Sequence, residues 1–169
     1  MRQLIQDTIE RTPGNAYLQG KKAKFIQIDE DWGFKFYSYK EDANQTYEMQ
    51  KYLASHGLAP QVGEQMCIRL PNGSYQYGYV TEVAAILSDI KARQLGFKDE
   101  LEMCAQPNGR ALYNQCDDEW EDSDDFIWLT DQIRKVKVEE FDTHVSNVGY
   151  IRGKIVVIDV HQYEFKEDI

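Results

Sequence analysis

Two acidic residues and one amide near the end of the chain have the types and spacing for metal-assisted chemistry. Asp142 is followed five residues later by Asn147, and Asp159 comes twelve residues after Asn147. A loop can hold Asp142 and Asn147 together, and a hairpin after Asn147 can bring Asp159 back beside it. Mg²⁺ prefers such oxygen ligands, and a carboxylate can accept the proton of a hydroxyl group. The alternative is that these are ordinary loop residues and Asp159 ends a strand.

A lysine in the first half of the chain could add positive charge to the same chemistry. Lys35 lies among aromatic residues in the expected strand 32–39, and a lysine in so apolar a strand needs a partner. Glu48 lies thirteen residues on, in an expected helix, and Glu41 is the other candidate partner. The alternatives are an edge-strand position for Lys35 and an ordinary exposed position for Glu48.

Together these segments resemble the protein-kinase-like superfamily. Residues 142–147 have the form D-x-H-x-x-N, which is similar to the loops of aminoglycoside-phosphotransferase-type and atypical kinases. In that family a hairpin follows the asparagine and delivers a second aspartate. A lysine on the third strand is followed there by a helix with a pairing glutamate, and residues 56–62 (HGLAPQV) are similar to the segment after that helix.

The resemblance implies ATP and Mg²⁺ as cofactors and a role for each residue. Asp142 would accept or orient the proton of the substrate hydroxyl, and Asn147 and Asp159 would hold Mg²⁺. Lys35, paired with Glu48, would bind the phosphates of ATP.

The remainder of the nucleotide site is also implied by the resemblance. A strand that enters the hinge between two lobes would carry Thr81 at the gatekeeper position, and the backbone of Glu82 and Ala84 would bond adenine. The phosphate loop would carry Gly14 and Gly20, which let backbone N–H groups approach phosphate. This segment lacks the dense glycine pattern of the family.

The chain departs from the family after Asp159. Val160 and His161 follow in place of Phe-Gly, and eight residues remain beyond His161. We therefore expect neither an activation segment nor later helices that dock a peptide. The expected fold is α+β, bilobal and kinase-like, with an antiparallel-sheet N-lobe (about 12–82) and a strongly reduced helical C-lobe (about 83–169).

Hydrophobic periodicity and turn residues predict the elements that position these groups. Asn72-Gly73 between two strand-like runs predicts a hairpin. The seven acids in residues 117–125 predict a solvated loop, followed by a helix that Ser123 or Asp124 caps. The other expected elements are helices at about 1–11, 42–55 and 83–94, strands at 23–29, 32–39, 66–70 and 75–83, and a terminal hairpin of 148–151 and 155–160.

Charge and cysteine content restrict the class of protein. The net charge is −10 and the pI about 4.8, which disfavours direct binding to nucleic acid. No apolar run is long enough to span a membrane, and the N-terminus does not resemble a secretory signal. Cys67, Cys104 and Cys116 are odd in number and widely spaced, so we expect free thiols in a reducing compartment, the cytoplasm.

Three functions remain open from the sequence. The first is a minimal kinase that transfers the γ-phosphate of ATP to a serine or threonine hydroxyl of a protein; it is similar, by analogy, to stand-alone kinases of phage or bacterial effector origin. The second is a pseudokinase that acts as an acidic binding or inhibitory module on a partner enzyme, such as a basic host protein. The third is an acidic inhibitor or nucleic-acid mimic on an unrelated α+β fold.

Overall fold

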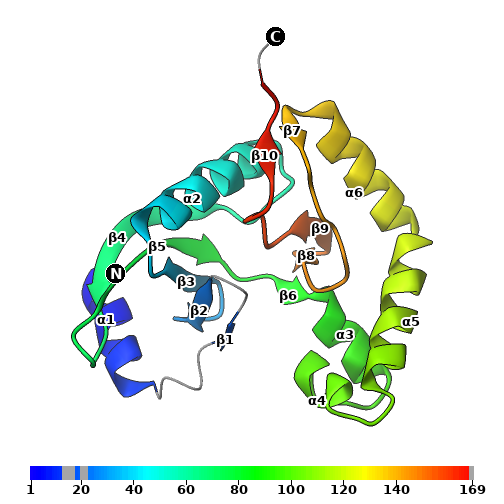
Figure 1. The fold of residues 1–169 in the computed structure, drawn as a ribbon, viewed down its shortest axis with the longest axis horizontal. Coiled ribbons are helices and arrows are strands. Elements are labelled where there is room, and N and C mark those ends of the chain that lie inside the picture. The colour runs from blue at the N-terminus through cyan, green and yellow to red at the C-terminus, as the bar shows by residue number, and fades with distance from the viewer. Residues whose placement is uncertain (13–17, 20–22, 168–169) are drawn as a thin grey trace. The chain divides into compact units, whose positions relative to one another are not determined.

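The computed structural model describes residues 1–12, 18–19 and 23–167. Contacts within the chain separate two compact units, whose helices and strands are labelled in Figure 1. The first unit consists of Met1–Ser55 and Pro60–Val83, and the second of His56–Ala59 and Ala84–Ile169. Each unit combines helices with antiparallel strands, so the expected α+β class is confirmed.

An antiparallel sheet forms the centre of the first unit, with the strand order β1-β2-β3-β5-β4. The hairpin predicted from Asn72-Gly73 joins β4 to β5. Gly73 has a φ of 87°, a left-handed conformation that glycine adopts readily, and its amide donates to the Leu70 carbonyl at 2.9 Å. The strands are β1 (Leu18–Gln19), β2 (Lys24–Gln27), β3 (Trp32–Tyr37), β4 (Val62–Arg69) and β5 (Tyr75–Glu82).

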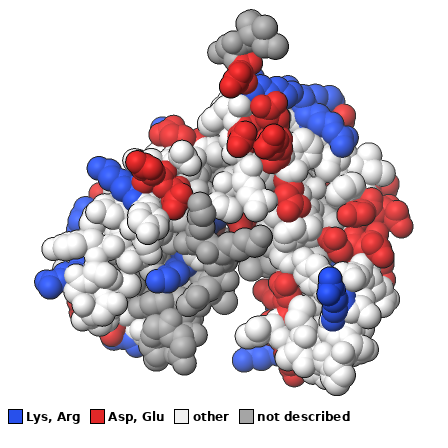
Figure 2. Space-filling view, in the orientation of Figure 1, with Lys and Arg blue, Asp and Glu red and all other residues white. Residues whose placement is uncertain are grey.

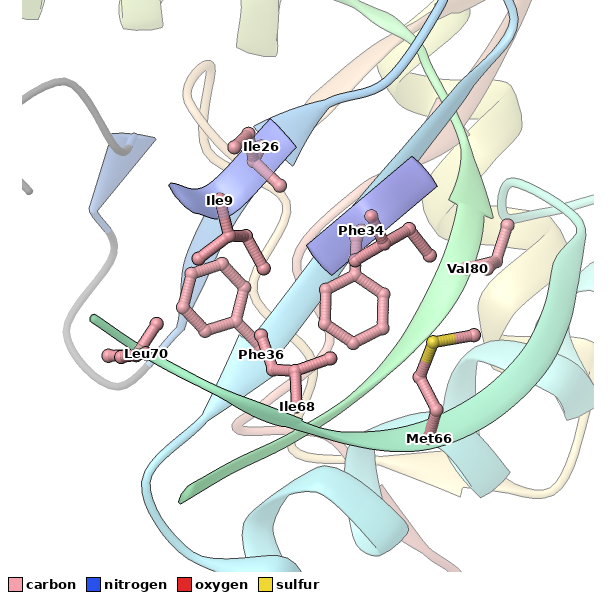
Figure 3. Close-up of a cluster of buried hydrophobic side chains, with 9 residues drawn as sticks. Ile9, Ile26, Phe34, Phe36, Met66, Ile68, Leu70 and Val80 are labelled. Atoms are coloured by element: carbon pink, nitrogen blue, oxygen red, sulfur yellow. The ribbon is translucent and has the colours of Figure 1, made fainter. Parts of the chain in front are cut away.

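One face of this sheet packs against α1 (Arg2–Arg11). Ile5 and Ile9 lie one turn apart on the helix and are fully buried in one cluster with Phe34 and Phe36 of β3 (Figure 3). Alternate strand residues share a face, so the two phenylalanine rings stack with centroids 5.8 Å apart. The other buried members of this cluster are Ile26, Met66, Ile68, Leu70 and Val80.

The opposite face packs against α2 (Lys40–Ser55), where Tyr37 and Tyr79 are buried with Ala43. Because a helix covers each face, β3 is buried continuously from residue 33 to residue 37. Lys35 lies directly opposite Tyr79 in the register of β3 and β5, and therefore on the α2 side of the sheet. The edge-strand alternative for Lys35 is wrong, because β3 lies between β2 and β5.

Helices and two small antiparallel sheets form the second unit. The predicted terminal hairpin is confirmed as β8 and β9, and it turns at Arg152 and Gly153, whose φ angles are 50° and 77°. Positive φ at both central residues is typical of the type I′ turn, whose twist matches that of the strands. The helices are α3 (Leu87–Gln94), α4 (Glu100–Cys104), α5 (Gly109–Glu121) and α6 (Asp124–Lys135). The strands are β6 (Ala85–Ile86), β8 (Val148–Ile151) and β9 (Lys154–Val157) in one sheet, and β7 (Val138–Glu139) and β10 (Glu164–Phe165) in the other.

The prediction of a loop over the acidic residues 117–125 is wrong, because α5 and α6 include most of them. Cys116 and Trp120 lie one turn apart and are buried, so they anchor this end of α5 in the core of the unit. Most of the acids are solvent-exposed, and Figure 2 shows acidic side chains gathered at the right, over α5 and α6. Ser123 caps α6 as predicted, since its Oγ accepts the amide N–H of Phe126 at 3.1 Å.

The helix expected from residue 83 begins later, at Leu87. Residues 85 and 86 instead pair with β8 and form β6. A Cβ atom at Gly149 would lie 2.5 Å from the carbonyl oxygen of Ala85, so glycine permits the close approach of these two strands.

In the part of the chain that the structure describes, no helix combines the length and apolarity needed to cross a membrane. All three cysteines carry free thiols, as predicted. Burial raises the pKa of Cys104 and of Cys116 above the ordinary value. Both thiols therefore remain protonated at neutral pH and are poor nucleophiles.

Among the side chains that the structure describes, the Tyr37 hydroxyl is buried without a hydrogen-bond partner. An unpaired buried hydroxyl costs about 1–3 kcal/mol, so Tyr37→Phe is expected to raise the free energy of unfolding by about 1 kcal/mol. Urea denaturation would measure the change. Tyr75→Phe is the control, because Tyr75 is 59% exposed and its replacement should leave stability within about 0.5 kcal/mol. A less stable Tyr37→Phe protein would contradict the prediction.

Candidate active site

The segment from Asp142 to Asn147 joins β7 to β8 as an irregular loop that closes on itself. The amide of Asn147 donates to the His144 carbonyl at 2.8 Å, and the Asn147 side chain donates to the Asp142 carbonyl at 3.4 Å. The Asp142 side chain is 46% exposed. Its carboxylate is therefore accessible to a molecule that approaches from solvent.

The structure brings Asn147 and Asp159 together, as the spacing predicted. The carbonyl of Asn147 accepts the amide N–H of Ile158 at 2.8 Å and that of Asp159 at 3.4 Å. One oxygen of the Asp159 carboxylate, Oδ1, accepts the amide of His161 at 3.2 Å. The hairpin thus returns a carboxylate to the end of the loop that carries the amide.

The donor atoms of this pair fit Mg²⁺, which is bound in proteins by a few side-chain oxygens together with water and phosphate. Among the described residues, no group of three or more His, Cys, Asp and Glu side chains is placed to hold a metal ion. The amide oxygen of Asn147 and the carboxylate of Asp159 are of the type that Mg²⁺ prefers, and their role as ligands stays a prediction.

His144 lies beside the Asp142 carboxylate in a defined tautomer. The amide of Ser146 donates to His144 Nδ1 at 3.2 Å, so this nitrogen carries no proton in the neutral ring. The proton is then on Nε2, which lies 3.6 Å from Asp142 Oδ2. Asp142 Oδ1 also accepts the amide of His144 at 3.2 Å. Both oxygens are therefore held in place by the same residue.

Helices of the second unit satisfy the backbone groups that an irregular loop leaves unpaired. The indole N–H of Trp120 donates to the Thr143 carbonyl at 2.6 Å, and the amide of Val145 donates to Asp117 Oδ1 at 2.9 Å. The amide of Ser88 donates to the Val145 carbonyl at 3.1 Å. The loop is thus attached to both α3 and α5.

The carboxylate of Glu100 on α4 also holds the loop, through hydrogen bonds. It accepts the hydroxyl protons of Ser146 at 3.1 Å and of Ser88 at 2.6 Å. The Tyr113 hydroxyl lies 2.6 Å from the Ser146 hydroxyl and 3.2 Å from His144 Nδ1, so its proton has two acceptors within reach. Burial raises the pKa of Tyr113, which keeps that proton in place.

Tyr163, in the segment after Asp159, is attached to the start of the loop. Its hydroxyl donates to the Asp142 carbonyl at 2.7 Å, and its ring lies against Phe141 with centroids 6.2 Å apart. Burial, followed by the nearby carboxylates of Asp142 and Asp159, raises the pKa of Tyr163 above its usual range. The hydroxyl therefore remains a hydrogen-bond donor at physiological pH.

In the first unit, Lys35 is buried, with 8% exposure, on the sheet face that α2 covers. Glu48 is exposed on α2 and forms no hydrogen bond or ion pair with the other residues that the structure describes. The predicted ion pair between Lys35 and Glu48 is therefore not formed, and Glu41 is exposed as well. The sequence identified the helix but not the side of it that faces the sheet.

The expected hinge residues already take part in hydrogen bonds. Thr81 is buried, and its Oγ1 accepts from the Gln50 side chain at 2.7 Å. The amide of Glu82 donates to the Gln61 carbonyl at 3.0 Å, and Glu82 Oε1 accepts the Gln61 amide at 2.8 Å. The Glu82 amide is thus engaged with Gln61. Ala84 is partly exposed at the start of the second unit.

The predicted phosphate-loop residues Gly14 and Gly20 lie outside the described residues. Sequence reasoning missed the side chains that hold the loop from Asp142 to Asn147: Glu100, Asp117, Trp120 and Tyr163. No local signal marks them, because Asp117 and Trp120 lie within or beside an acidic run that is typical of solvent-exposed segments. Their role follows only from tertiary contacts.

No protein-family profile matches the chain, and no curated protein matches it. Several solved structures do resemble the chain. A 2.2 Å crystal structure of WbdD matches with a TM-score of 0.46 and 12% identity, and the match covers 92% of this chain and 34% of the WbdD chain. The GDP and kanamycin complex of an aminoglycoside 2″-phosphotransferase, APH(2″)-IIIa, has a TM-score of 0.42 and 15% identity, over 98% and 73%. The streptomycin–ATP complex of APH(2″)-IIa has a TM-score of 0.41 and 12% identity, over 89% and 67%.

At these identities and TM-scores the matches carry no argument for a superfamily, and the resemblance to the protein-kinase-like superfamily stays a prediction. The chain spans about one third of the WbdD chain and 67–73% of these two phosphotransferase chains. Since the identities are low and the TM-scores are below 0.5, the functional argument rests on this chain's own residues.

Removal of the Asp117 carboxylate should loosen the loop. Asp117→Ala leaves the buried amide of Val145 unpaired, which should lower the free energy of unfolding by about 1–3 kcal/mol. The Val145 amide should also exchange with solvent faster, as NMR would show. Asp118→Ala, at an exposed neighbouring position, is the matched control and should change stability by less than about 0.5 kcal/mol. Equal effects of the two variants would refute the bracing role.

The raised pKa of Tyr163 should make stability depend on alkaline pH. The ordinary tyrosine pKa is 10.0, and the folded protein keeps Tyr163 neutral above that pH, whereas the unfolded chain ionises it. The stabilisation by this group is therefore complete below pH 10 and declines above it, by about 1.4 kcal/mol per pH unit. Urea unfolding of the wild type and of Tyr163→Phe between pH 8 and pH 11 measures the difference. A difference that stays constant across this range would contradict the assignment.

Proposed function

We propose that this protein is a small ATP- and Mg²⁺-dependent phosphotransferase that transfers the γ-phosphate to a serine or threonine hydroxyl of a protein. The observation that carries the proposal is the closure of the β8–β9 hairpin, which places Asp159 beside Asn147 at the end of the loop that bears Asp142. A cytoplasmic location is part of the proposal, and the three free thiols support it.

Asn147 and Asp159 would hold Mg²⁺ through their side-chain oxygens, and the bound ion would neutralise charge on the phosphates. Lys35, whose side chain is buried in the first unit, would bind the phosphates of ATP, as the resemblance implies. Phosphoryl transfer needs little covalent help from a protein beyond such positioning and charge.

Asp142 would orient the acceptor hydroxyl and take its proton. His144 favours one orientation of the carboxylate, because it donates from its amide to one oxygen and presents Nε2 to the other. The remaining lone pairs of the half-exposed carboxylate can accept the hydroxyl proton of a substrate. The hydrogen bonds of Glu100, Asp117 and Trp120 hold the loop that carries Asp142 in one conformation.

A second candidate is a binding module without phosphotransfer, which the acidic surface supports. Exposed carboxylates gather over α5 and α6 (Figure 2), and such a surface attracts a basic protein partner. The two candidates differ in whether Asp142 and Asp159 matter for activity.

Two measurements test the proposal. MgATP should raise the melting temperature of the wild type by mass action, and Asp159→Asn should lose the Mg²⁺-dependent part of this shift. With labelled ATP and a pool of proteins, the wild type should incorporate phosphate. Asp142→Asn should reduce incorporation by about 10²–10⁴-fold while it retains the ATP-induced shift.

Asp118→Asn is the control for a changed carboxylate, because this exposed residue of α5 takes no part in the loop. It should label proteins at the wild-type rate. Equal labelling by Asp142→Asn and the wild type would eliminate the kinase proposal. Undiminished capture of a basic partner by Asp142→Asn and Asp159→Asn, without any labelling, would establish the binding module.

A further inference from the structure

A buried amide joins α2 to the sheet face that carries Lys35. Gln50 is 1% exposed, and its Nε2 donates to Thr81 Oγ1 at 2.7 Å and to the Pro60 carbonyl at 3.1 Å. Its Oε1 accepts the hydroxyl proton of Tyr79 at 2.7 Å. The Pro60 carbonyl can only accept, so the orientation of the amide is unambiguous. Both N–H groups and the carbonyl oxygen are thus satisfied.

The partners of Gln50 lie close to the positions implied for nucleotide binding. Tyr79 is the residue directly opposite Lys35 in the β3–β5 register, and Thr81 follows it two residues on, on the same face of β5. Pro60 lies in the connection between α2 and β4. The amide of Gln50 therefore attaches α2 to β5, the strand beside Lys35, and to the segment that follows α2.

The position of Gln50 excludes Glu48 from this face. Residues two positions apart on an α-helix point roughly 200° away from each other. With Gln50 directed at the sheet, Glu48 is directed to solvent, as its exposure shows. Rotation of α2 to bring Glu48 toward Lys35 would break three buried hydrogen bonds and leave their partners without water.

We infer that Gln50, an uncharged residue, is the positioning residue of the Lys35 side of the sheet, because its hydrogen bonds hold α2 to β5 and to Pro60. The inference rests on the proposed function for the role of Lys35, but the attachment itself does not. Since an amide has no charge near neutral pH, the attachment of α2 through Gln50 is independent of pH between 6 and 9.

The first test compares substitutions on α2 in the full chain. Gln50→Leu should speed hydrogen exchange of the α2 amides in the nucleotide-free protein at least tenfold, and should weaken MgATP binding by a similar factor in calorimetry. Glu48→Gln should leave both within twofold. Gln45→Leu, the same replacement at an exposed position of α2, is the matched control and should also change neither. Unchanged exchange in Gln50→Leu, or equal effects of Glu48→Gln and Gln50→Leu, would overturn the inference.

The second test uses a variant that keeps the shape of the side chain. A glutamic acid at this position can donate a proton to Pro60 or Thr81 only while its carboxyl group is neutral. Because burial raises the pKa of a carboxyl group at a position only 1% exposed, Gln50→Glu should show near wild-type α2 exchange at pH 6 and faster exchange at pH 9, whereas the wild type, corrected for intrinsic exchange, should not change. A pH-independent Gln50→Glu protein would refute the role of donation by the amide.

The two tests separate this inference from the proposed function. If the wild type fails to bind MgATP, the proposed function fails, while the exchange of α2 still decides the role of Gln50. To exclude general unfolding of Gln50→Leu, the double variant Gln50→Leu/Tyr79→Phe removes both the amide and one of its partners. Its melting temperature should lie above the value that the two single variants predict by addition. Additive effects would show that Gln50 and Tyr79 are not coupled.

Discussion

The carbonyl oxygen of Asn147 accepts the amide protons of Ile158 and Asp159, and the geometry of the candidate site in the second unit depends on this closure. Without it, the strands β8 and β9 would carry Asp159 away from the loop that they follow. The tight turn at Arg152 and Gly153 makes the closure achievable, because positive φ at both residues matches the twist of a two-strand ribbon.

A loop of this kind has a cost, because its backbone groups are removed from water without the regular pairing of a helix or a sheet. Here helices and a returning segment supply the missing partners, through Trp120, Asp117, Glu100 and Tyr163. The acidic end of α5 therefore serves two purposes. Its inner side chains hold the loop, and its outer carboxylates give the surface its charge.

Local signals predicted much of the fold and part of the candidate site. The two hairpins, the cap at Ser123, the pairing of Asn147 with Asp159 and the strand that carries Lys35 all follow from patterns of a few residues. The predictions that failed concern orientation. Glu48 was expected to face the sheet and the acids after Cys116 to form a loop, but each outcome depends on which side of a helix meets its neighbour.

The sequence by itself determined where the chain turns and which residue types stand near one another along it, because glycine, proline, capping residues and hydrophobic alternation act over short distances. Only the tertiary structure decided that Gln50 rather than Glu48 is buried, and that Trp120 and Tyr163 reach the loop. The reason is that a buried polar group must find its partner across the core, where the lowest free energy depends on all surrounding side chains together.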